Sequence, residues 1–146
     1  MLDDFGLQAA LEWYVRDFTA RYGLNVQLDL GGALDSVPDR HRVCAYRAVQ
    51  EALTNCIRHA DATWINVRVC GVDSQLHITV TDDGVGLDAE RRRSGLGLRG
   101  IEERVKELEG VMTVGDAMAK GTRLEITLPL PQSVSTEGIS FARAAG

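Results

Sequence analysis

The sequence lacks the long apolar runs and the leader patterns that take proteins into or across membranes. No stretch approaches the roughly 18 consecutive apolar residues of a membrane-spanning helix. The beginning does not have the pattern of a signal peptide either, because acidic residues follow Met1 within two positions. We therefore expect the chain to be cytoplasmic, while a membrane anchor elsewhere in a longer parent protein stays open.

The sequence is also poor in cysteine, and its net charge is negative. Cys44, Cys56 and Cys70 are odd in number and have no C-x-x-C spacing, which argues against a disulfide framework and against a metal site. We interpret them as small core residues in a reducing compartment. The formal charge of −5 argues against a basic nucleic-acid-binding surface, so we expect no direct nucleic acid binding. A local basic site for a small anionic ligand is compatible with this charge.

Neither of two common nucleotide-binding motifs occurs in the position that its fold requires. The pattern G-x-x-x-x-G-K-[ST] does not occur, which excludes a P-loop NTPase. The pattern G-x-G-x-x-G does not follow the first expected strand, which argues against a dinucleotide-binding fold. What remains is a chain of 146 residues, the size of one domain, with the apolar and charged content of a soluble globular protein.

The residues from Tyr46 to Ala60 have the periodicity of a helix with two distinct faces. At a period of 3.6 residues, one apolar stripe contains Tyr46, Val49, Leu53, Cys56, Ile57 and Ala60. A neighbouring polar stripe contains Glu51, Asn55, Arg58 and His59. For such a helix alone, the plain interpretation is a solvated face with ordinary charge pairing. The glycine-rich sequence further along the chain favours a binding site instead.

The order of the expected helices and strands predicts the fold class. Helices are expected over 7–22 with Gly23 as a stop, over a long segment capped by Asp39 and reaching His59 or Ala60, and over 98–109. Alternating apolar residues predict strands over 24–30, 64–70, 74–82, 111–114 and 122–130, with 71–73 closing an antiparallel hairpin. This order fits an α+β fold, a two-layer sandwich with a mixed sheet and helices on one face.

A polar loop with two glycine-rich ends joins the strand expected over 74–82 to the helix expected over 98–109. It opens with DDGVG at residues 82–86 and closes with GLGL at residues 95–98. Either pattern alone is typical of a plain turn or a flexible loop. Together they are suited to a nucleotide, because glycines let the backbone approach a ligand and the N–H groups at a helix start bind phosphate. The Asp82 carboxylate can accept a hydrogen bond from an exocyclic amine such as adenine N6.

The polar stripe supplies the remaining chemistry of such a site. Asn55 offers a neutral oxygen suited to Mg²⁺, which bridges nucleotide phosphates. Arg58 can neutralise phosphate charge, and Glu51 can orient a water or complete the metal shell.

Four segments in this order resemble the catalytic, ATP-binding domain of sensor histidine kinases, and most closely the NarL-type subfamily. They are QEALTNCIRHA, TDDGVG, SGLGLRGIEERV and GTRLEITLPL, within a similarity that runs from about Leu2 to Pro131. The opening LDDFGLQAALEW looks like the family's junction between dimerisation helices and catalytic domain. The resemblance implies a Bergerat-type fold, with residues 1–22 as the end of the dimerisation region, 23–131 as the catalytic domain and 132–146 as a disordered tail.

The resemblance also implies a role for each matching residue. Glu51 and Asn55 match the catalytic positions, with Asn55 as the magnesium ligand and Glu51 in the metal shell. The positions that match ATP contacts are Asn55, Arg58, His59, Asp82, Gly84, Gly86, Leu87, Gly95, Leu96, Gly97, Leu98 and Thr122. Residues 87–94 match a short ATP lid. One departure is Glu109-Gly110, where the family usually has a Gly-Gly pair at the end of the helix.

The function implied is that of a protein-histidine kinase, with ATP and Mg²⁺ as cofactors. Its domain would supply the γ-phosphoryl for a histidine located outside this sequence, because His41, His59 and His77 do not lie in the family's acceptor motif. The implied partners are the histidine-bearing dimerisation domain of a homodimeric parent kinase and the receiver domain of a response regulator. Two alternatives are a nucleotide-binding regulatory module without catalysis and an anti-sigma-factor-type serine kinase.

Overall fold

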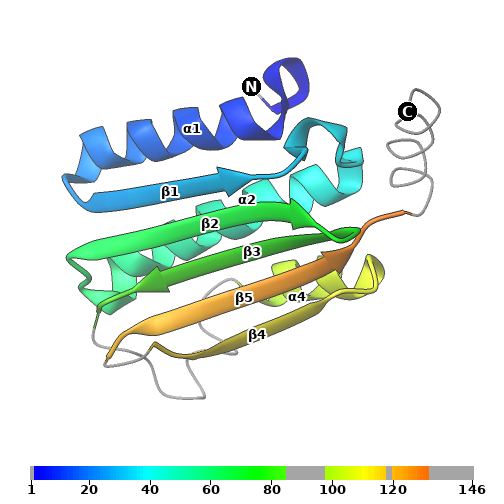
Figure 1. Cartoon of the computed structure of the whole chain (residues 1–146). Helices are drawn as coiled ribbons and strands as arrows, with labels where there is room; N and C mark the ends of the chain where they lie inside the picture. The colour runs from blue at the N-terminus through cyan, green and yellow to red at the C-terminus, as the bar shows by residue number, and fades with distance from the viewer. Residues whose placement is uncertain (1, 85–97, 118–119, 132–146) are drawn as a thin grey trace.

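The computed structural model describes residues 2–84, 98–117 and 120–131, and these form two layers, a sheet and a layer of helices (Figure 1). The helical elements in chain order are α1 (Leu2–Tyr22), a 3-10 turn η1 (Leu34–Ser36), α2 (Asp39–Asn55), a π turn η2 (Cys56–Ala60) and α4 (Leu98–Glu107). The strands are β1 (Asn25–Gly31), β2 (Trp64–Val72), β3 (Gln75–Asp82), β4 (Val111–Asp116) and β5 (Thr122–Pro129).

The strands of the described residues form one mixed sheet in the order β1-β2-β3-β5-β4. β1 and β2 are parallel, and every other neighbouring pair is antiparallel. The parallel pair is connected through α2, as a parallel connection requires a crossover. α1, α2 and α4 lie on the same side of the sheet (Figure 1). The predicted α+β sandwich with a mixed sheet and helices on one face is therefore confirmed.

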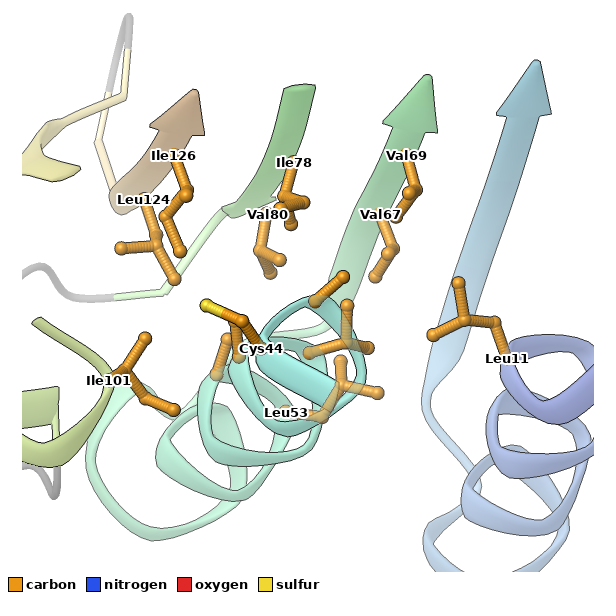
Figure 2. Packing of buried hydrophobic residues seen from close by; sticks show 14 of the residues in the cluster. Leu11, Cys44, Leu53, Val67, Val69, Ile78, Val80, Ile101, Leu124 and Ile126 are labelled. Atoms are coloured by element: carbon orange, nitrogen blue, oxygen red, sulfur yellow. The ribbon is translucent and has the colours of Figure 1, made fainter. Parts of the chain in front are cut away.

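The core lies between the sheet and the helices because each central strand alternates apolar and polar residues. The buried strand residues are Ile65, Val67 and Val69 in β2, Leu76, Ile78 and Val80 in β3, and Leu124, Ile126 and Leu128 in β5. Figure 2 shows six of them, Val67, Val69, Ile78, Val80, Leu124 and Ile126, on the side of the sheet that faces the helices, and Leu11 of α1, Leu53 of α2 and Ile101 of α4 belong to the same cluster. Burying each such side chain contributes about 1.5–3 kcal/mol. The strand alternation read from the sequence thus determines which face of the sheet carries the helices.

Three local predictions were wrong. Asp39 does not cap α2, because Pro38 occupies the N-cap position and the Asp39 side chain pairs with Arg42 inside the first turn. The hairpin closes at Asp73 and Ser74, which both have positive φ, and not over 71–73, so β2 extends to Val72 and β3 begins at Gln75. Ile57 is 38% exposed and leaves the apolar stripe, because the helix changes from α to π spacing at Cys56.

Two helix ends follow the sequence closely. α1 ends at Gly23, which has φ +71° and donates its N–H to the Thr19 carbonyl at 2.8 Å. α4 ends with Glu109 at φ +62°, with hydrogen bonds from Gly110 N–H to Val105 O at 2.8 Å and from Glu109 N–H to Lys106 O at 2.9 Å. This pair of bonds is a Schellman motif with glutamate in the place where glycine is preferred.

Among the described residues, no helix has both the length and the apolar character needed to cross a lipid bilayer.

Candidate functional site

Asp82 lies at the end of β3 and faces the C-terminal end of α2. Its side chain is on the core side of the sheet, with 5% exposure for the whole residue. One carboxylate oxygen, Oδ1, accepts the Gly84 N–H at 2.8 Å, and the other, Oδ2, accepts the Cys56 S–H at 3.4 Å. The structure therefore brings the first glycine of the polar loop and the end of the long helix to the same carboxylate.

The adjacent Asp83 has a different environment. It accepts hydrogen bonds from Thr63 N–H at 2.8 Å, from Trp64 N–H at 3.0 Å and from the Thr63 hydroxyl. These bonds lower the pKa of the Asp83 carboxyl to about 2, because they stabilise its charged form. Asp83 thus anchors the start of β2. No role was predicted for Asp83, although the alternation of the strand indicates one, since residues 78, 80 and 82 face the core and residue 83 does not.

The start of β5 lies directly against Asp82. A Cβ atom at Gly121, whose φ is +106°, would lie 1.9 Å from the Asp82 carbonyl oxygen, so only glycine permits this approach. The next residue is Thr122, whose Oγ1 is buried and has no hydrogen-bond partner among the described residues. A buried hydroxyl without a partner costs free energy, which a ligand or a bound water can recover. Gly121 was missed as a site residue, and Thr122 was predicted.

The polar stripe of α2 ends beside this carboxylate. Asn55 is the last α-helical residue, and it immediately precedes Cys56, the residue in contact with Asp82. Glu51 lies one turn earlier and, like Asn55, is partly buried, whereas Arg58 in the π turn is exposed. His59 belongs to the same π turn, but its side chain lies outside the described residues. Single π turns within helices occur often at functional sites.

The remaining predicted site residues belong to the polar loop and to the start of α4. Gly86, Leu87, Gly95, Leu96 and Gly97 lie outside the described residues, together with the predicted lid over 87–94. Leu98 begins α4 and is buried, with 5% exposure. Its predicted contact with a nucleotide stays a prediction.

Among the cysteines of the described residues, only Cys56 forms a hydrogen bond with a predicted site residue, Asp82. Burial raises the pKa of the thiol, and the negative charge of Asp82 raises it further. Cys56 therefore stays protonated and donates its S–H to the carboxylate. Cys44, fully buried in the middle of α2, has a pKa raised to about 11 by burial. All three cysteines are free thiols, as predicted.

Known proteins with similar sequences are named as sensor histidine kinases. The chain is 35% identical over 133 residues to the sensor histidine kinase MctS of Rhizobium johnstonii, covering 88% of this chain and 29% of that protein. It is 37% identical over 122 residues to the sensor histidine kinase YxjM of Bacillus subtilis, covering 83% of this chain and 30% of that protein. The chain thus spans less than a third of the length of these two relatives.

Solved structures show the same fold. The histidine kinase domain of the blue-light activated histidine kinase from Erythrobacter litoralis EL346 superposes with a TM-score of 0.68 at 25% identity, over 91% of this chain and 65% of that chain. Residues 41–132 match the family described as histidine kinase-, DNA gyrase B- and HSP90-like ATPases, and these residues are more than half of the sequence. The chain therefore belongs to the histidine kinase-, DNA gyrase B- and HSP90-like ATPase family.

Proposed function

We propose that this chain is the ATP-binding catalytic domain of a NarL-type sensor histidine kinase in the cytoplasm, with residues 1–22 as its lead-in and 23–131 as its catalytic unit. The observation that carries the proposal is the buried Asp82 carboxylate, which accepts hydrogen bonds from the Gly84 N–H and from the Cys56 S–H at the end of α2. The names of the relatives support the kinase assignment.

In this proposal the adenine end of ATP lies against Asp82. The carboxylate accepts the N6 amine, and the Thr122 hydroxyl, which has no partner among the described residues, takes part in the same polar contact directly or through a water. Gly84 and Gly86 leave room for the purine, and the N–H groups around Gly95 and Gly97 would hold the phosphates. Leu87, Leu96 and Leu98 would enclose the nucleotide.

The opposite end of the proposed site is the polar stripe of α2. Asn55 would offer its side-chain oxygen to Mg²⁺, and Glu51, partly buried one turn earlier, would hold water of the metal shell. Bound Mg²⁺ supplies positive charge that offsets the charge on the phosphates during transfer. Arg58 is exposed and free to reach outward to the phosphates, with His59 next to it. The residues would act mainly by positioning and by neutralising charge.

The acceptor histidine would belong to the dimerisation domain of the homodimeric parent kinase, and the phosphoryl group would then pass to the receiver domain of a response regulator. Two histidines of this chain instead make contacts within the fold. His41 is buried with Nε2 3.0 Å from the Pro129 carbonyl oxygen, and His77 lies in β3 with Nδ1 3.4 Å from Thr127 Oγ1. Neither faces the proposed nucleotide.

Calorimetric titration with ATP and Mg²⁺ tests the nucleotide site. We expect Asp82→Asn to weaken ATP binding at least about tenfold, because the N6 amine then no longer has a charged acceptor. A hydrogen bond to a charged group contributes about 1.5–3 kcal/mol to the free energy of binding. Asn55→Ala should weaken binding only when Mg²⁺ is present. Asp83→Asn is the matched control and should leave the affinity unchanged. Normal ATP binding by Asp82→Asn would show that the adenine assignment is wrong.

A second experiment tests the kinase assignment. The chain is mixed with a separately prepared histidine-bearing dimerisation domain and ATP labelled in the γ-phosphate. Label on the histidine, stable in base and labile in acid, is expected. A chain that binds ATP but labels no histidine would favour the regulatory module, and acid-stable label on a serine would favour the serine kinase.

A further inference from the structure

The Cys56 thiol and the Gly84 amide together fix the Asp82 carboxylate. Each of the two oxygens receives one donor from the chain, Oδ1 at 2.8 Å and Oδ2 at 3.4 Å. With both oxygens held, the carboxylate cannot turn about its terminal bond without losing a contact. The thiol comes from the helix layer, whereas Gly121 and Thr122 belong to the end of the sheet where β5 runs beside β3.

Cys56 differs in this respect from the other buried cysteine of the same helix. Cys44 is fully buried within the apolar cluster, and no hydrogen bond to a site residue is found for it among the described residues. Cys56 is 4% exposed and touches the one buried carboxylate of the described residues. An apolar side chain of similar size at residue 44 or residue 56 would fill the core equally well. A thiol at residue 56 adds a donor, with Sγ 3.4 Å from Asp82 Oδ2.

We propose that Cys56 is a positioning residue for purine recognition, holding Asp82 Oδ2 so that the free lone pairs of the carboxylate face the amino edge of adenine. This inference rests on the proposed nucleotide site. Cys56 acts through Asp82 and undergoes no covalent step. Its contribution is selectivity, since a carboxylate held as an acceptor favours the N6 amine of adenine over the carbonyl that hypoxanthine has at the same ring position.

The test compares dissociation constants for ADP and IDP, measured by calorimetry on the full chain. In the wild type we expect ADP to bind more tightly than IDP. Cys56→Ala should weaken ADP binding about three- to tenfold, as expected for one weak donor to a charged group, while IDP binding stays nearly constant. Cys56→Ser should keep the ADP preference, because its hydroxyl still donates to Asp82. Cys44→Ala, which alters packing only, should leave the ratio of the two constants unchanged.

Three results would overturn the inference: an unchanged ratio in Cys56→Ala, an equal loss of both nucleotides in that variant, or a Cys56→Ser variant that loses the preference as Cys56→Ala does. A wild type that binds neither nucleotide would instead show that the proposed function is wrong.

A measurement on the wild type covers the case in which Cys56→Ala fails to fold. The infrared S–H stretching band of Cys56 is identified as the band missing in Cys56→Ser and present in Cys44→Ser. ADP should shift this band, because the ligand and the thiol share one carboxylate, and IDP should shift it less. A band that ADP does not move would overturn the proposal.

Discussion

Asp82 and Asp83 carry the same functional group one position apart, yet their surroundings differ in every respect that matters to function. Asp82 faces the core side, where its buried carboxylate lies beside a closely packed glycine and a hydroxyl that has no partner in the described part of the chain. Asp83 faces outward, and its carboxylate accepts three hydrogen bonds from Thr63 and Trp64 at the start of β2. The first is suited to a ligand and the second to the fold. Strand parity decides between them, because a strand turns alternate residues to opposite faces.

Asp83 gives the folded state a defined pH dependence. Its pKa in the folded chain is about 2, below the ordinary value near 3.8, so the stability it contributes is fully present above about pH 4. That contribution is lost as the pH falls through the interval from about 4 to about 2. We expect urea unfolding to show a stability difference between wild type and Asp83→Asn at pH 6 that shrinks by pH 2.5. Parallel loss of stability in both proteins across that interval would contradict the assignment.

The residues that could be predicted from the sequence are those whose role follows from local spacing. Asp82, Asn55 and Glu51 were placed near one another by periodicity and motif order, and the structure places Asn55 beside the Asp82 contact. Cys56 was predicted as a core residue, and its second contact was not. A hydrogen bond between residues 26 positions apart depends on how a strand end and a helix end meet, which no local pattern specifies.

At the scale of the element, α2 shows where periodicity stops being a guide. Its stripe predicted burial correctly for Val49, Leu53 and Cys56. Beyond Cys56 the π turn alters the angle between successive side chains, so Ile57 turns outward and the helix ends at Asp61 with φ +53°. A stripe drawn at 3.6 residues per turn cannot anticipate this change. The change occurs where Asn55 is proposed to hold Mg²⁺ and Arg58 and His59 to meet the phosphates.

The end of α4 gives a stability prediction. Glu109 adopts a left-handed conformation that costs a residue with a side chain about 1–2 kcal/mol, a cost only partly offset by the greater backbone freedom that glycine loses on folding. We expect Glu109→Gly to stabilise the chain by about 0.5–1 kcal/mol, which corresponds to a rise in Tm of about 1–4 °C. Glu103→Gly, an exposed position inside the same helix, is the matched control and should lower stability by about 1 kcal/mol. Calorimetric melting distinguishes the two signs, and a lower Tm for Glu109→Gly would contradict the Schellman geometry.

At the scale of the whole molecule, the sheet order follows from connections more than from the strands themselves. β2 and β3 pair because a two-residue turn joins them, and α2 is the crossover that makes β1 and β2 parallel. The position of β5 between β3 and β4 is a long-range pairing, and sequence periodicity does not specify it. That pairing places Gly121 and Thr122 beside Asp82, so the site depends on the least predictable part of the sheet.

The sheet has two faces of opposite character. Its covered face carries the apolar residues described above, and the other face carries polar side chains that include Gln27, Asn66, Arg68, Thr79 and Thr81. Neighbouring strands match these residues in register, for example Arg68 between Asp29 and Thr79. A sheet with one polar face needs helices on the other face only, which explains why α1, α2 and α4 form a single layer.

The single helical layer gives the last prediction, which concerns α1. Leu7, Leu11, Val15 and Phe18 of this helix belong to the same buried cluster as the central strands. Losing one such side chain, as in Leu11→Ala, is expected to cost about 2–5 kcal/mol, and a domain has about 5–15 kcal/mol of net stability in all. Removing residues 1–22 should therefore abolish cooperative thermal unfolding, while Leu11→Ala should only lower Tm. Removing residues 132–146, which were predicted to be a tail, is the control and should leave Tm unchanged. A chain of residues 23–131 that still melts cooperatively near the wild-type Tm would show that the sheet, α2 and α4 form a complete core without α1.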